Sequence, residues 1–139
     1  MKKILIYSVA LAIMLGNLTC NAQSNKTPEA KNSVSNKVEV YYFHFTRRWN
    51  TCISVEENEK LAVETLYPEK VKTGEYTFKA MNLDDSGSKA IAEKLGIGGQ
   101  TLIVVHDKNK IDITDKGFLN AHDLVKMKEE IKKAIEQVL

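Results

Sequence analysis

The stretch VEVYYFHFTRRWNTCISVEE, residues 38–57, holds the features that decide the fold. Its first part, residues 38–45, is rich in β-branched and aromatic residues and is apolar on both faces. Such a run is typical of a central strand in a parallel sheet. Asn50 or Thr51 can cap a helix that follows and runs to about Leu66. The stretch therefore predicts a strand that enters a helix through a short loop.

The predicted helix ends before Pro68 and has two different faces. Val55, Ala62 and Leu66 lie on one apolar stripe, which we expect to face the core. The charged residues are expected on the water side: Glu56, Glu57, Glu59 and Lys60.

The rest of the chain predicts three more strands and two more helices. The strands are YTFKAMNL at 76–83, TLIVV at 101–105 and IDIT at 111–114, the last two forming a hairpin. Between the first two of these lies a short helix, which Asp85 or Ser86 can cap and which Gly96 ends. The last helix starts at about Asn120 or Ala121, with one apolar face made of Leu124, Met127, Ile131, Ala134 or Ile135, and Val138.

The predicted order is therefore β-α-β-α-β-β-α. The early strands are joined by helices and are expected to be parallel with right-handed crossovers, whereas the hairpin strands are antiparallel. We predict an α/β domain with a four-stranded mixed sheet flanked by helices, which is the thioredoxin fold. A flavodoxin-like domain needs five alternating units, for which this chain has no room.

The N-terminus predicts export. Lys2 and Lys3 precede a short apolar run, residues 4–16, and a small-residue site that allows cleavage after Ala22. The run is too short for a membrane span, which needs roughly 20 residues. The alternative to cleavage after Ala22 is lipid attachment at Cys20, which closes the apolar run.

The domain organisation follows from this: a signal peptide at 1–22, a flexible polar tether at 23–37 and one domain at 38–139. We expect the protein in the periplasm or cell envelope, soluble or lipid-anchored. Without the two signal lysines the chain has as many basic as acidic residues, which argues against a nucleic-acid partner. After cleavage Cys52 is the only cysteine, so an internal disulfide is ruled out.

The motifs VYYFHFTRR, NTC and SVE in this stretch, with NLD at 82–84, GQTLIVV at 99–105, DIT at 112–114 and FLNA at 118–121, resemble a known family. It comprises small exported bacterial thioredoxin-like proteins known as the ArsF-type subunit of a nitrophenyl-compound nitroreductase. The resemblance covers about residues 38 to 135. It implies a C-x-T-C motif whose second thiol is Cys52, whose threonine is Thr51 and whose first thiol position holds Trp49. Gln100 stands where thioredoxins place a cis-proline.

Two sulfurs within bonding reach are needed for dithiol exchange, and this chain lacks the first. Cys52 is then a small core residue, a thiolate that forms a mixed disulfide with a partner, or a metal ligand, although it has no ligand-spaced neighbours. Arg47, Arg48 and Trp49 form either a solvated loop or a recognition tip for a partner or an oxyanion. His44 is expected to be a hydrogen-bonded sheet residue, and the histidines at 106 and 122 surface groups.

These features favour an accessory or interaction protein of an envelope redox system, with a protein of the envelope as its partner. The alternatives are a monothiol oxidoreductase that uses Cys52, assisted by Thr51, with a partner's cysteine, and a small-ligand or oxyanion binder at Arg47, Arg48 and Trp49, with Gln100 beside them. No cofactor and no metal are expected: GIGGQT at 96–101 precedes a strand, whereas phosphate-binding loops precede helices.

Overall fold

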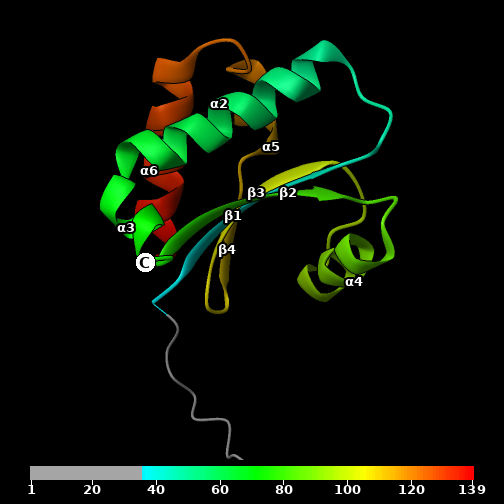
Figure 1. Ribbon diagram of the computed structural model, residues 1–139, viewed down its shortest axis with the longest axis horizontal. Helices are drawn as coiled ribbons and strands as arrows, with labels where there is room; N and C mark the ends of the chain where they lie inside the picture. Colours follow the sequence, from blue (N-terminus) through cyan, green and yellow to red (C-terminus); the bar gives the residue numbers. More distant parts are fainter. Residues whose placement is uncertain (1–35) are drawn as a thin grey trace, which may run out of the picture. The chain divides into compact units, whose positions relative to one another are not determined.

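The computed structural model describes residues 36–139 (Figure 1). The predicted signal peptide, Cys20 and the tether as far as residue 35 lie outside the described residues. Among residues 36–139, no helix has both the length and the apolar character that crossing a bilayer requires.

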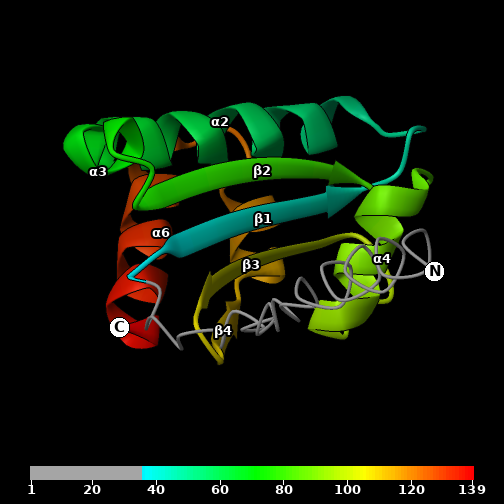
Figure 2. The ribbon, with the colours of Figure 1, turned by 60° about the horizontal axis from the view of Figure 1, so that its bottom comes forward.

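Four strands form one mixed sheet in the order β2-β1-β3-β4. They are β1 (Val38–His44), β2 (Tyr76–Asn82), β3 (Thr101–His106) and β4 (Asn109–Asp112). Strand β1 lies in the middle, parallel to β2 and antiparallel to β3, and β3 and β4 form the predicted hairpin (Figure 2).

The direction of β3 corrects the expectation that every strand after a helix is parallel. The last residue of β2, Asn82, lies opposite His44, and the first residue of β3, Thr101, lies opposite Phe43. The helix between them therefore returns the chain to the sheet end where β2 finishes. With its strand order and directions, the domain is an α/β sandwich of the thioredoxin type.

The helices cover the two faces of the sheet unequally (Figure 1). Helices α2 (Asn50–Leu66), α3 (Pro68–Lys72), α5 (Thr114–Leu119) and α6 (Leu124–Val138) lie on one face, and α4 (Ser86–Leu95) lies on the other. A large apolar core fills the first side, and a smaller one, built on Tyr41, Phe43 and Ile103, lies under α4.

The helix ends differ from the predicted ones in several details. The N-cap of α2 is Trp49, and no side chain caps it, so neither Asn50 nor Thr51 has the predicted role. Asp85 is the N-cap of α4 but makes no capping hydrogen bond with its side chain. Gly96 ends α4 with a φ of 71°, the left-handed conformation that glycine tolerates best.

The last helix begins at Leu124, later than the predicted start at about Asn120 or Ala121, and a short helix that was not predicted, α5, precedes it. α5 ends at Leu119, and α6 begins after Asp123, whose carboxylate accepts a hydrogen bond from the backbone N–H of Lys126. The predicted apolar face of α6 is confirmed, since its residues from Met127 to Val138 are buried and Leu124 is half-buried against the same core.

One residue of α2 contradicts the predicted division of that helix. Val55 and Ala62 are buried as expected, but Glu59 is also fully buried, with an exposed fraction of 0%. Glu59 lies four residues after Val55 and three before Ala62, which places its side chain on the same inward stripe. The prediction that it faces water is wrong.

Candidate functional site

The junction between β1 and α2 holds the residues that the sequence singled out. Trp49 has an extended backbone, and its carbonyl oxygen accepts hydrogen bonds from the backbone N–H groups of Cys52 (3.0 Å) and Ile53 (3.3 Å). Trp49 and Cys52 therefore lie one helical turn apart, at the start of α2. The indole points away from the fold, with 84% of Trp49 exposed.

The first half of the loop is fastened to the end of β2. The backbone N–H of Thr46 donates to Asp84 Oδ2 (2.8 Å), and its hydroxyl accepts from Asn82 Nδ2 (2.8 Å). These contacts hold the pKa of the Asp84 carboxyl below its usual value, because the Thr46 N–H and hydroxyl stabilise the charged form. Asp84 therefore stabilises the loop.

The two arginines of the loop have different surroundings. Arg48 Nη1 forms an ion pair with Glu56 Oε2 on the second turn of α2, and both side chains are partly buried. Arg47 is exposed and forms no ion pair within the described part of the chain. A cleft of about 270 Å³ is lined by Arg47, Arg48 and Trp49. The structure thus leaves Arg47 and Trp49 available to a ligand, whereas Arg48 fastens the loop to the helix.

Cys52 lies beneath this loop, with an exposed fraction of 5%. Gln100 Nε2 donates to the Tyr42 hydroxyl (2.5 Å), and both side chains lie beside the thiol. Burial raises the pKa of Cys52, but hydrogen bonds from Gln100, the backbone of Trp49 and Tyr42 outweigh it and leave the pKa below the usual value. The site therefore stabilises a thiolate but shields it from solvent.

Thr51 and the three histidines are the remaining candidate residues. Thr51 is exposed on the first turn of α2. His44 is buried at the end of β1, where its Nδ1 lies 3.0 Å from the carbonyl oxygen of Phe45 and its Nε2 lies 3.8 Å from Glu56 Oε2. His122 is exposed, and His106 is half-buried with Nδ1 3.3 Å from the carbonyl oxygen of Val138. The described residues hold no cluster of histidine, cysteine or carboxylate side chains suited to a metal ion.

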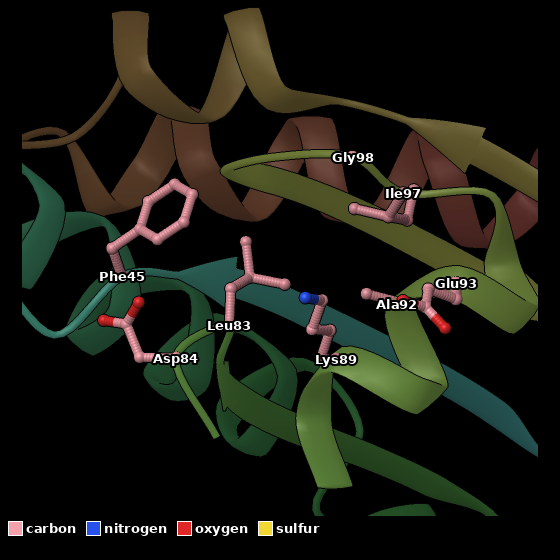
Figure 3. A pocket seen from close by; sticks show the side chains of 8 residues that line it. All are labelled: Phe45, Leu83, Asp84, Lys89, Ala92, Glu93, Ile97 and Gly98. Atoms are coloured by element: carbon pink, nitrogen blue, oxygen red, sulfur yellow. The ribbon is translucent and has the colours of Figure 1, made fainter. Parts of the chain in front are cut away.

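A second cleft, of about 360 Å³, lies on the α4 side of the same sheet end (Figure 3). Phe45, Leu83 and Ile97 provide apolar walls, and the side chain of Lys89 reaches in from α4. Sequence reasoning missed this cleft, because it combines Phe45 with residues 83–98, which are far apart in the chain. It also missed Tyr42, which the apolar strand pattern placed in the core with no polar role.

Comparisons with known proteins do not name a family. No protein-family model and no curated protein matches this chain. One solved structure, described as a malarial protein, is 20% identical, with a TM-score of 0.46 over 71% of this chain and 98% of the other.

Proposed function

We propose that this protein is an exported accessory protein that binds an envelope partner through the loop at the start of α2 and does not catalyse dithiol exchange. The observation that carries the proposal is the exposure of Trp49, 84%, at the position one turn before the shielded Cys52. Tryptophan and arginine are among the residues most enriched at binding hot spots. Arg47 lines the same cleft as Trp49, and its charge has no ion-pair partner among residues 36–139. The segment 45–49 contributes to both clefts: Phe45 lines the larger one, and Arg47, Arg48 and Trp49 line the smaller one.

The variant Trp49→Ala is expected to lose its partner. Truncation of a hot-spot residue costs about 2 kcal/mol or more, which corresponds to roughly thirtyfold weaker binding. Tagged protein is used to capture envelope proteins of the producing bacterium, and the captured partner is identified and then titrated against each purified variant. Arg47→Ala is expected to weaken the same complex, with a larger loss at low salt than at high salt.

Leu119→Ala is the matched control, because Leu119 is also 84% exposed but lies at the end of α5. Equal affinity of the Trp49→Ala and Leu119→Ala variants for the partner contradicts the proposal. Arg48→Ala is unsuitable as a test, since its loss also removes the ion pair with Glu56.

A second candidate function is a monothiol oxidoreductase, and the lowered pKa of Cys52 favours it. In such a reaction the Cys52 thiolate attacks a disulfide, a mixed disulfide forms, and the other sulfur leaves as a thiolate. Burial opposes the attack, because the thiol is only 5% exposed.

Incubation with glutathione disulfide at neutral pH separates the two functions. If the protein is an interaction protein, peptide-resolved mass spectrometry is expected to find glutathione on Cys52 only after unfolding in urea. Unmodified protein incubated without glutathione disulfide provides the reference masses. An adduct on Cys52 of the native protein within minutes supports the monothiol reaction.

A further inference from the structure

The carboxyl group of Glu59 is the most unusual polar group in the described part of the chain. It is fully buried, and neither Oε1 nor Oε2 has a hydrogen-bond partner there. A neutral carboxylic acid tolerates such a position at a moderate cost, whereas an unpaired carboxylate does not.

The surroundings of Glu59 offer no positive charge. On its own helix the nearest charged group is Glu56. Strand β1 contributes the phenol of Tyr42, β3 contributes the apolar side chain of Leu102, and α5 contributes Gly117, where an added Cβ lies 3.1 Å from Glu59 Oε1. Lys116, the cation of α5 directly before this glycine, is paired with Glu130 of α6 (3.0 Å).

Burial, and then the repulsion from Glu56, raise the pKa of Glu59 well above the usual carboxyl value. The folded domain therefore holds the proton, while any state that exposes Glu59 to water releases it at the ordinary pKa. A rise in pH favours the exposed state for this reason.

We expect helix α5 to be the element around Glu59 that opens most easily. It has six residues, of which Gly117 alone is buried, and its N-cap makes no side-chain hydrogen bond. By contrast, α2 has seventeen residues with five buried, and β3 lies between two other strands. Short elements with little buried surface have the lowest local opening free energies.

Helix α5 also contacts a residue that neighbours the thiol. The Phe118 ring packs against the Tyr42 ring, with 6.4 Å between centroids, and the Tyr42 hydroxyl lies beside Cys52. We therefore expect movement of α5 away from α2 to uncover the Tyr42 ring and, next to it, Cys52.

We propose that Glu59 is a proton-operated latch: when protonated it allows α5 to close over Tyr42 and Cys52, and when ionised it releases α5 and exposes the thiol. The device makes access to Cys52 depend on pH, independently of whether the loop at Trp49 binds a partner.

Hydrogen exchange of the α5 amides at a series of pH values tests the latch. After division by the intrinsic rate, exchange at the N–H groups of Gly117 and Asn120 is expected to rise about tenfold per pH unit between the ordinary and the raised carboxyl pKa. Glu59→Gln is expected to abolish this rise, and Glu57→Gln, an exposed carboxyl on the same helix, is expected to keep it. The amides of α4 are expected to show no rise in the wild type.

The alkylation rate of Cys52 is measured on the peptide that contains it and divided by the fraction of thiolate at each pH. This corrected rate must show the same pH dependence as the α5 exchange and the same response to Glu59→Gln. The α5 amides of the wild type must also exchange faster than those of β1, because the opening is local. The wild-type measurements alone overturn the proposal if α5 and β1 exchange equally fast, if the corrected α5 rate is independent of pH, or if Cys52 alkylation does not follow α5.

Discussion

The variant Trp49→Cys is expected to form an internal disulfide with Cys52 and to reduce insulin disulfides, which the wild type is not expected to do. The backbone already has the required form: Trp49 is the N-cap of α2, and its carbonyl accepts from the Cys52 N–H at 3.0 Å. Residues three apart in a helical turn have Cα atoms about 5 Å apart, which lies within the range that a disulfide bridges. Oxidation by glutathione disulfide removes one hydrogen from each thiol and yields two glutathione molecules.

The measurement is the intact mass of the oxidised protein, with the disulfide located on the peptide that contains both sulfurs. Asn50→Cys is the control, because residues two apart on a helix do not face each other. A Trp49→Cys protein that stays reduced, or that carries bound glutathione and no internal disulfide, shows that the loop has a geometry unsuited to dithiol chemistry.

The second large effect concerns stability: Glu59→Gln is expected to unfold at a higher urea concentration than the wild type at about pH 8, with the gain vanishing near pH 4. The folded pKa of Glu59 is raised, so the native state binds more protons than the unfolded state above the usual carboxyl pKa of 4.5. Wild-type stability therefore falls as the pH rises through this window, by about 1.4 kcal/mol for each unit by which the pKa is raised.

Glutamine keeps the size and the neutral charge of the protonated acid. Near pH 4 the wild type and the Glu59→Gln variant therefore carry the same charge at this position, and their stabilities can be compared directly. Glu57→Gln is expected to follow the wild type at every pH, since that side chain is exposed. A stability gain of Glu59→Gln that is the same at every pH shows that the carboxyl group does not titrate between the folded and unfolded states.

The sequence predicted the four strands and three of the five helices of residues 36–139, because local patterns determine them, whereas the short helices α3 and α5 were not predicted. Strand β1 reads as apolar on both faces, and it lies between two strands with helices on both sides. The bounds of α2 at Asn50 and Leu66 follow from the change of hydrophobic period and from Pro68. The direction of β3 could not be predicted, because the apolar run TLIVV looks the same in a parallel and an antiparallel strand.

The sequence identified candidate functional residues but not the contacts that they make. The loop at 47–49 was identified, but the sequence could not show that Arg48 pairs with Glu56 while Arg47 has no such partner within residues 36–139. Glu59 was predicted to face solvent because it is charged, although its spacing from Val55 and Ala62 predicts that it lies on the inward face of the helix. At this position helical geometry was the better guide than residue type.

The fastening of the Trp49 loop at both ends has a consequence for how binding proceeds. Thr46 is held by the end of β2, and Arg48 is held by Glu56, so the backbone between them has little freedom left to lose. Within the loop, the conformational entropy lost on binding is then confined to the side chains of Arg47 and Trp49, at about 0.5–1.5 kcal/mol each, and it adds to the translational and rotational entropy that any association loses. Association should accordingly be a single kinetic step without a slow rearrangement, and substitutions in the loop should change the lifetime of the complex more than its rate of formation.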